Sequence, residues 1–180
     1  MSMKSSTLLN GDEITLAINR ISLQVLEKNH SPDNLAIVGI HTCGVFLAQR
    51  MRSFIQGQTS QLLPYGSLDI NLYRDDWSLI TQNPVVKTTD IGFDVEGKDV
   101  ILVDDVLFTG RTIRAAMEAL MDYGRPRTIQ LAILVDRGGR EIPVQADYVG
   151  LTTSVRPDER IQVMLQEQSG QDQVVLQNQE

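Results

Sequence analysis

The sequence predicts an α/β protein with a mainly parallel sheet that is flanked by helices on both faces. Short apolar runs at residues 35–40, 100–103 and 129–135 fit buried strands. Segments with helical spacing of apolar residues alternate with these runs. Strands that alternate with helices form parallel sheets, because a parallel connection needs a crossover. In such sheets ligands bind outside the carboxyl ends of the strands, which directs the search for a site.

The composition is that of one folded domain. The 180 residues are 42% apolar and 22% charged, which is ordinary for a globular protein of this size. The formal charge of −7 argues against non-specific binding to nucleic acid, although a local basic patch stays open. No apolar run approaches the roughly 20 residues of a membrane span, and no secretory signal is visible at the N-terminus. The single cysteine, Cys43, has no partner for an intrachain disulfide. We therefore expect a cytoplasmic protein that does not enter a membrane.

The first half of the chain supplies two helices and two strands. Gly11 and Asp12 offer an N-cap for a helix over residues 13–29, whose apolar side chains recur at helical spacing. The strand at residues 35–40 leads through a glycine-bounded turn at residues 39–44 into a helix at residues 45–56. Apolar and polar residues alternate over residues 68–72, which predicts a half-exposed strand.

The second half carries the longest irregular segment and the most regular elements. Residues 74–89 show no periodicity, and a loop of this length is often a lid over a site. The helix at residues 111–123 ends at Gly124, and Pro126 prevents its continuation. Shorter strands are expected at residues 146–150 and 161–165. We assign residues 1–165 to a single domain and expect the glutamine-rich residues 166–180 to form a poorly ordered tail.

The motif that carries chemistry is V-I-L-V-D-D-V-L-F-T-G-R-T at residues 100–112. The carboxylates of Asp104 and Asp105 follow an apolar strand and can accept hydrogen bonds from ribose hydroxyls. The T-G-R-T turn opens a helix, and its backbone N–H groups with the helix dipole suit a phosphate. Together these features indicate a sugar-phosphate site. The alternative that the aspartates are ordinary strand-end carboxylates leaves the T-G-R-T turn unexplained.

This motif resembles the signature of phosphoribosyltransferases that use phosphoribosyl pyrophosphate (PRPP). Two flanking segments, L-D-I-N-L-Y-R-D-D at residues 68–76 and D-R-G at residues 136–138, resemble the PyrR family. Members of that family are uracil phosphoribosyltransferases that also regulate pyrimidine genes by binding RNA. The resemblance extends from the first predicted helix to about residue 165. It implies a type I phosphoribosyltransferase-like fold with a flexible lid loop and a small hood.

The resemblance also implies a reaction and a set of roles. Uracil and PRPP would give UMP and pyrophosphate, with Asp104 and Asp105 as the catalytic carboxylates. The lid would act through Arg74 or Lys87, and the base would lie under a hood that includes Asp136 and Arg137. Mg²⁺ would arrive with the pyrophosphate oxygens rather than occupy a site made by protein ligands alone. The expected PRPP- and phosphate-binding residues are Val106, Leu107, Phe108, Thr109, Gly110, Arg111 and Thr112, and the expected pyrophosphate turn is His41, Thr42, Cys43 and Gly44.

Two departures from the family pattern leave alternatives open. The pyrophosphate turn reads H-T-C-G where relatives carry K-T-R-G, so a cation is lost beside the leaving group. Several positions at which the family would place basic residues for RNA are neutral, among them Leu16, Leu23, Gln145 and Leu151. The basic residues that remain as candidates for RNA contact are Arg20, Arg137, Arg140, Arg156 and Arg160.

Three functions therefore compete. The first is a uracil phosphoribosyltransferase, with UMP-sensing attenuation of pyrimidine genes as a second activity. The second is an RNA-binding regulator of a leader hairpin with weak or no catalysis. The third is a phosphoribosyltransferase for another base, such as a purine or orotate, which the two flanking segments disfavour. The family resemblance also implies a homodimer or a larger assembly.

Overall fold

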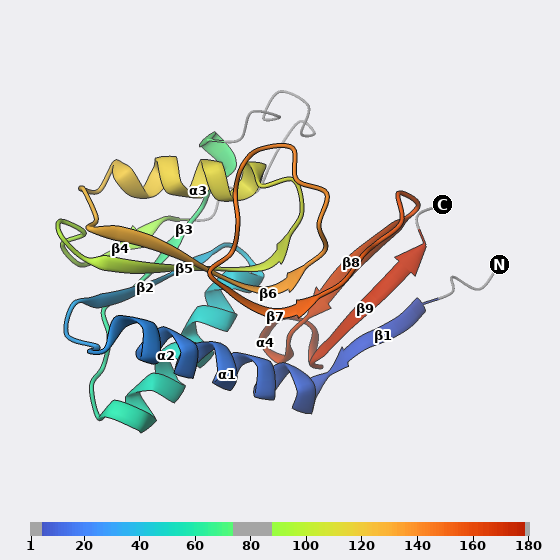
Figure 1. The fold of residues 1–180 in the computed structure, drawn as a ribbon, viewed down its shortest axis with the longest axis horizontal. Helices are drawn as coiled ribbons and strands as arrows, with labels where there is room; N and C mark the ends of the chain where they lie inside the picture. Colours follow the sequence, from blue (N-terminus) through green and yellow to red (C-terminus); the bar gives the residue numbers. More distant parts are fainter. Residues whose placement is uncertain (1–4, 74–87, 179–180) are drawn as a thin grey trace.

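The computed structural model, which describes residues 5–73 and 88–178, contains two sheets (Figure 1). In the larger sheet the strand order is β4-β3-β2-β5-β6-β7, and every neighbouring pair is parallel except β3 with β4. This arrangement confirms the predicted α/β class. The strands of this sheet are β2 (Leu35–Ile40), β3 (Tyr65–Leu68), β4 (Asp90–Ile91), β5 (Asp99–Leu107), β6 (Thr128–Asp136) and β7 (Tyr148–Thr152).

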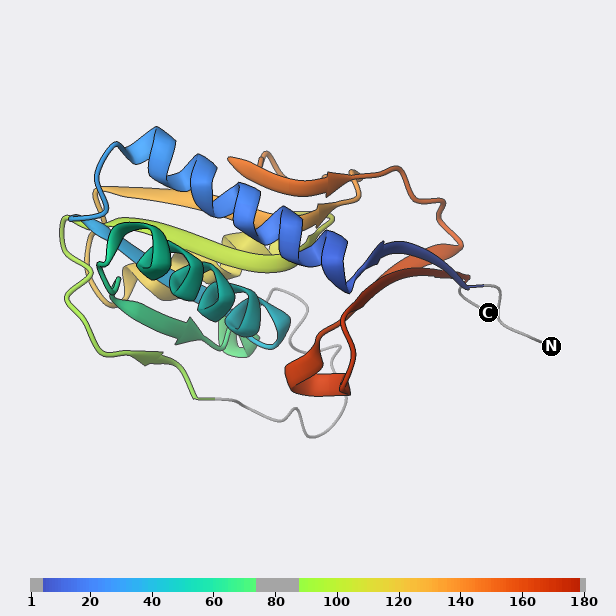
Figure 2. The ribbon, with the colours of Figure 1, turned by 90° about the horizontal axis from the view of Figure 1, so that it is seen from below.

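Helices cover both faces of the larger sheet. Helices α1 (Gly11–Asn29) and α2 (Cys43–Thr59) lie side by side on one face, and α3 (Arg111–Met121) lies on the other (Figures 1 and 2). Successive side chains of a strand point to opposite faces, so Ile101 of β5 packs under α1 and α2 while Leu102 packs under α3. Among the described residues, no helix is long and apolar enough to cross a membrane.

Helix α1 begins with a capping box. The side chain of Asn10 accepts a hydrogen bond from the backbone N–H of Glu13 at 2.9 Å, and the Glu13 carboxylate accepts one from the Asn10 N–H at 2.8 Å. These bonds satisfy two N–H groups at the start of the helix and fix where it begins. The N-cap is Asn10 rather than the predicted Gly11 or Asp12, so the helix begins about two residues earlier than expected.

The prediction of a strand over residues 68–72 is wrong. β3 ends at Leu68, and the chain turns into the short 3₁₀ helix η1 (Asn71–Tyr73). The Asp69 carboxylate accepts a hydrogen bond from the backbone N–H of Asn71 at 3.0 Å, and the backbone N–H of Asp69 donates to the Thr89 hydroxyl at 2.9 Å. These side-chain bonds take the place of ladder bonds and turn the chain, because aspartate favours such local turns. The predicted lid, with Arg74 and Lys87, falls largely outside the described residues.

The prediction of a poorly ordered tail after residue 165 is also wrong. Residues after 165 form α4 (Gln166–Ser169) and β9 (Gln173–Asn178), and Val174 is fully buried. β9 pairs antiparallel with β1 (Ser5–Asn10) on one side and β8 (Glu159–Met164) on the other, which forms the second sheet, with strand order β1-β9-β8. The glutamine-rich segment is ordered because a strand from the other end of the chain pairs with it.

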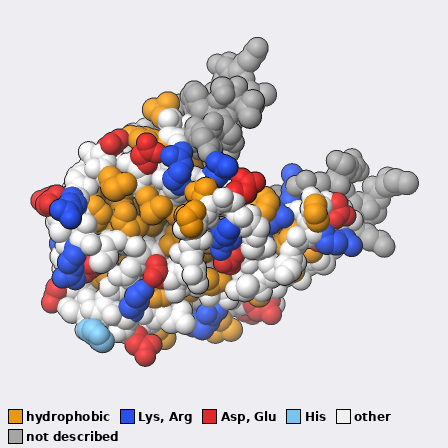
Figure 3. All heavy atoms as spheres, turned by 45° about the horizontal axis from the view of Figure 1, so that its top comes forward, with side chains coloured by type: hydrophobic (Ala, Val, Ile, Leu, Met, Phe, Trp, Pro, Cys, Tyr) orange, Lys and Arg blue, Asp and Glu red, His pale blue; other side chains and the backbone are white. Residues whose placement is uncertain are grey.

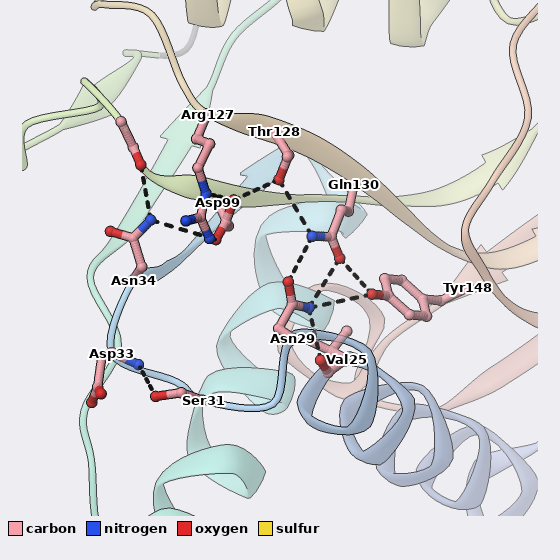
Figure 4. Close-up of polar contacts among 11 residues, drawn as sticks. Val25, Asn29, Ser31, Asp33, Asn34, Asp99, Arg127, Thr128, Gln130 and Tyr148 are labelled. Atoms are coloured by element: carbon pink, nitrogen blue, oxygen red, sulfur yellow. Dashed lines mark hydrogen bonds and ion pairs between the residues drawn. The ribbon is translucent and has the colours of Figure 1, made fainter.

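A polar network closes the amino-terminal end of the large sheet (Figure 4). Asp99, at the start of β5, is 4% exposed and accepts hydrogen bonds from Arg127 Nε at 2.9 Å and from the Thr128 hydroxyl at 2.8 Å. The side chain of Gln130 donates to the Asn29 side chain at 2.7 Å and so joins β6 to the end of α1. Hydrogen bonds from Arg127 lower the pKa of the Asp99 carboxyl despite its burial, which shows a buried charge that is well paired.

Candidate active site

The two aspartates of the central motif lie within β5 rather than after it. The strand was predicted to end at residue 103, but its pairing with β6 continues as far as Leu107. Val103 and Val106 both pack on the core under α1 and α2, so the strict alternation of side chains is broken at Asp104 and Asp105. Each aspartate accepts a hydrogen bond from the next backbone N–H, at 2.9 Å for Asp104 and 2.8 Å for Asp105. The two carboxylates are therefore held close to the main chain.

The environments of the two carboxylates differ. Asp104 is only 6% exposed, whereas Asp105 is half-buried. Burial raises the pKa of the Asp104 carboxyl well above its usual range, and the neighbouring charge of Asp105 raises it further. Within residues 5–73 and 88–178, no ion pair joins either aspartate to a basic side chain. The pair thus offers one accessible carboxylate, that of Asp105, beside one that is hard to charge.

The loop after β5 reaches α3 through a glycine. Gly110 has φ +90°, and an added Cβ would lie 2.9 Å from Cγ1 of Ile142. The carbonyl of Thr109 accepts the backbone N–H of Glu141 at 3.0 Å, which ties the loop to the segment after β6. The N-cap residue of α3, Gly110, has no side chain to cap the helix, but the Thr109 hydroxyl accepts the backbone N–H of Arg111 at 3.3 Å. The first N–H groups of a helix have no partner inside the helix, so the loop and the helix start are suited to accept an anion such as phosphate.

The predicted pyrophosphate turn connects β2 to α2 and packs directly against β5. A Cβ on Gly44 would lie 2.4 Å from the carbonyl oxygen of Val103, so only glycine allows this approach. The backbone N–H of His41 donates to the carbonyl of Leu68 at 2.9 Å, and the peptide bond between His41 and Thr42 is cis. The turn therefore lies next to the aspartate pair.

The segment after β6 is a folded loop held by Arg140. Its guanidinium donates to the Asp136 carboxylate at 2.5 Å and to the backbone carbonyls of Phe108 at 2.9 Å and Val144 at 2.8 Å. Burial alone would raise the pKa of Asp136, but hydrogen bonds from Arg140 and from the Gly138 N–H outweigh it and lower the pKa. Arg140, predicted as a possible RNA contact, and Asp136, predicted to lie at the base, are both engaged in holding this loop.

Phe108 links the phosphate loop to the segment after β6. The Arg137 guanidinium lies 3.9 Å from the centre of the Phe108 ring, and a Cβ on Gly139 would lie 2.5 Å from the same ring. Burial lowers the pKa of Arg137, and among the described residues its Nε atom is buried without a hydrogen-bond partner. The sequence grouped Phe108 with the phosphate-binding residues, whereas its side chain contacts the predicted base hood.

The remaining basic residues predicted to contact RNA are spread over different elements. Arg20 on α1 donates to the carbonyls of Val149 and Gly150 in β7, at 3.1 and 2.6 Å. Arg156 pairs with Glu159 at 2.8 Å, and Arg160 donates to the Gln177 side chain. On the face seen in Figure 3, acidic and basic side chains are interspersed, without a continuous basic area.

The three predicted segments come together at one edge of the sheet. β2, β5 and β6 are neighbours, and their carboxyl ends carry residues 41–44, 104–112 and 136–140. A loop held by glycine, a helix start and an acidic pair at neighbouring parallel strands form an arrangement that suits a phosphorylated sugar. Arg74 and Lys87 lie outside the described residues and are not placed relative to it.

The fold and the sequence both match known phosphoribosyltransferases. The model of the phosphoribosyl transferase domain family matches residues 4–168. The hypoxanthine phosphoribosyltransferase of Trypanosoma cruzi superposes with a TM-score of 0.70 over 97% of each chain at 15% identity, which shows a shared fold. The chain is therefore a member of the phosphoribosyltransferase class.

Relatives at higher identity define the family more narrowly. Proteins called bifunctional protein PyrR are 50% identical in Bacillus cereus, 48% in Deinococcus radiodurans and 46% in Syntrophobacter fumaroxidans. The matches cover 96%, 98% and 96% of this chain and 97%, 96% and 92% of those relatives. The chain belongs to the PyrR family.

Proposed function

We propose that the chain transfers the phosphoribosyl group of PRPP to uracil and so forms UMP and pyrophosphate. The observation that carries this proposal is the convergence of the three segments at the carboxyl ends of β2, β5 and β6. Residues 104–112 would bind the ribose and the 5′-phosphate of PRPP, residues 41–44 would bind its pyrophosphate, and residues 136–140 would lie at the base. The membership in the PyrR family supports uracil as the base.

The aspartate pair would act on the ribose. Departure of pyrophosphate develops positive charge at the anomeric carbon, and a carboxylate nearby stabilises that charge. Asp105, the more exposed of the two, would accept hydrogen bonds from the ribose hydroxyls. Asp104 would act mainly through its effect on Asp105, because burial disfavours its own charge.

The phosphate groups would bind at the two helix starts. Residues 109–112, before and in the first turn of α3, would bind the 5′-phosphate, and residues 41–44, before and at the start of α2, would bind the pyrophosphate. The base would lie near Arg137, whose guanidinium the Phe108 ring holds in place. Arg74 and Lys87, from the segment predicted as a lid, would complete the site and exclude water.

Mg²⁺ would accompany the pyrophosphate. Among the described residues, no group of three or more His, Cys, Asp or Glu side chains is arranged to hold a metal ion. The half-buried Asp105 carboxylate fits an ion that is held mostly by substrate oxygens and water, as Mg²⁺ usually is. Its chemistry would be to neutralise charge on the leaving pyrophosphate.

RNA binding is the second candidate function, and the bifunctional relatives favour it. We propose that this chain binds a pyrimidine-operon leader hairpin weakly, with UMP as the sensed nucleotide. Arg20 and Arg140 already donate to backbone carbonyls, and Leu16 and Leu23 of α1 are 67% and 49% exposed at positions the family would make basic. Fewer available cations mean fewer phosphate contacts.

We also propose that the chain works in the cytoplasm as a homodimer or a larger assembly. The exposed Leu16 and Leu23 lie seven positions apart on α1, about two helical turns, and so on the same side of that helix. Sedimentation at micromolar concentration tests the assembly, and a clean monomer would refute it.

The decisive experiment for the enzymatic proposal is a steady-state assay of purified protein with PRPP and Mg²⁺. Uracil, hypoxanthine and orotate are compared as acceptors. The proposal expects UMP formation to exceed nucleotide formation from the other two bases. Turnover of hypoxanthine or orotate in preference to uracil would show that uracil is not the acceptor base. No turnover with any of the three bases would favour a regulator that only binds nucleotide.

A further inference from the structure

Arg50 on α2 holds a turn that follows the predicted domain. Its guanidinium donates from Nε and Nη2 to the Glu167 carboxylate at 2.9 and 2.6 Å. From Nη1 and Nη2 it donates to the Asp172 carboxylate at 2.9 and 2.7 Å. Arg50 and Asp172 are each only 22% exposed, and such two-pronged pairs are the strong form of an ion pair. We call these three residues the clamp.

The clamp orders a whole segment rather than two side chains. Glu167 lies in α4, and Asp172 lies between α4 and β9. The Asp172 carboxylate also accepts the backbone N–H of Gln166 at 2.7 Å, at the first residue of α4. The hydrogen bonds from Arg50 therefore hold the start of α4 and the turn that follows it against α2, and they lower the pKa of both carboxyls.

The same segment reaches the pyrophosphate turn. The thiol of Cys43, the first residue of α2, donates to the side-chain oxygen of Gln168 at 3.3 Å. Figures 1 and 2 both show α4 beside the end of α2 that begins at this turn. Arg50 lies seven residues after Cys43, about two helical turns along the same side of α2. α4 is thus attached to α2 twice, once at the turn and once at the clamp.

We propose that Arg50 is a positioning residue for the pyrophosphate end of the site. It holds α4 against the start of α2, and Gln168 then fixes Cys43 and, through it, the neighbouring Thr42. The guanidinium of Arg50 is committed to two carboxylates, so it acts through α4 rather than on the phosphates. This inference rests on the proposed function, because the role of the turn belongs to that proposal.

A matched pair of variants separates positioning from stability. Arg50→Gln removes the clamp, and its side chain borders an open hollow of about 410 Å³ between α1 and α2, so the change leaves no closed cavity. Arg52→Gln removes an arginine from the same helix for which, among the described residues, no hydrogen bond or ion pair joins the side chain to α4. Its Nε donates to the Leu63 carbonyl at 2.7 Å, and its guanidinium lies over the Tyr65 ring.

The experiment measures KM for PRPP, KM for uracil and kcat, together with calorimetric binding of pyrophosphate with Mg²⁺. We expect Arg50→Gln to raise KM for PRPP and Kd for pyrophosphate about tenfold, or about 1.4 kcal/mol. KM for uracil should stay within about twofold. Arg50→Lys should restore part of the loss, and Glu167→Gln combined with Arg50→Gln should add little to it.

Several results would overturn the inference. Equal effects of Arg50→Gln and Arg52→Gln would reduce the clamp to a stability contact, as would a lowered Tm of Arg50→Gln with unchanged KM for PRPP. A wild type that binds no pyrophosphate would also overturn the inference, because there would be no pyrophosphate site for Arg50 to position. A wild type that binds pyrophosphate but forms no UMP would refute the proposed function alone, since the calorimetry still compares the variants.

Discussion

The two ends of β5 carry the same residue type in opposite electrostatic states. Asp99 at the start and Asp104 near the end are 4% and 6% exposed. Hydrogen bonds from Arg127 lower the pKa of Asp99, whereas burial and the neighbouring charge of Asp105 raise the pKa of Asp104. The amino-terminal end of the sheet satisfies its buried charge with the protein's own groups, and the carboxyl end carries the acidic pair that we propose binds the ribose.

The difference between Asp99 and Asp104 indicates that the two ends of β5 have separate roles, one in stability and the other in the proposed function. A buried charge that is paired and hydrogen-bonded is tolerated, and one that lacks partners costs free energy. Under the proposed function, this cost is retained at the carboxyl end because the substrate would interact with the aspartate pair. We therefore expect substitutions at the two ends to have opposite consequences.

The largest expected effect is on turnover. Asp104→Asn combined with Asp105→Asn should lower kcat for UMP formation by several orders of magnitude, because each well-placed electrostatic partner contributes about 10²–10³. The free energy of unfolding should not fall, since both charges lack cationic partners among the described residues. UMP synthesis by the double variant at close to the wild-type rate would contradict a catalytic role for Asp104 and Asp105.

The next effect is on stability at the opposite end. Asp99→Asn weakens the hydrogen bonds from Arg127 and Thr128 and should lower the free energy of unfolding by about 1.5–3 kcal/mol, the range for bonds to a charged group. Because the network lies at the other edge of the sheet, kcat and KM should stay within about twofold. Urea unfolding and steady-state kinetics on one preparation check both parts, and a marked loss of turnover with no loss of stability would contradict them.

The RNA proposal predicts a smaller change. Wild type should bind a leader hairpin with a shallow salt dependence, and Gln145→Arg with Leu151→Lys should tighten binding and steepen the plot of log affinity against log salt. Each added phosphate contact contributes about 0.7–0.9 to the slope. Titrations at several salt concentrations give both quantities. Tight and steeply salt-dependent binding by the wild type would show that its remaining arginines suffice.

The smallest effect is a pH dependence of stability that Asp99 controls. Its pKa is lower in the folded state, so its stabilising contribution is complete above the unfolded value of about 3.9 and is lost as pH falls through the folded pKa. The difference in unfolding free energy between wild type and Asp99→Asn should therefore be constant from about pH 7 to 5 and shrink below about pH 4. A difference that grows toward acid pH would have the wrong sign for this cause.

The three segments of the candidate site could be predicted from the sequence because each is a contiguous motif that follows a strand. The apolar run, the two aspartates and the T-G-R-T turn are contiguous, and each of the three segments follows a recognisable strand. Pairing in parallel strands then places them at one edge. The extension of β5 to Leu107 was missed because two carboxylates within a strand resemble a strand end.

Contacts between distant residues were not predictable in this way. Asp99 depends on Arg127, 28 positions later, and Arg50 depends on Asp172, 122 positions later. The order of β9 depends on β1 at the other end of the chain. No periodicity or motif reports such pairs, and a glutamine-rich segment viewed without its partner strand has the composition of a disordered one.

The most direct test of the contrast is the single substitution Asp104→Asn, measured beside Asp99→Asn at neutral pH. Burial disfavours the charge of Asp104, so replacing it with a neutral amide should leave the free energy of unfolding equal to that of the wild type or raise it, while UMP formation falls. Asp99→Asn should give the reverse pattern. A loss of stability in Asp104→Asn as large as that in Asp99→Asn would contradict the account, because it would show that the protein itself satisfies both charges.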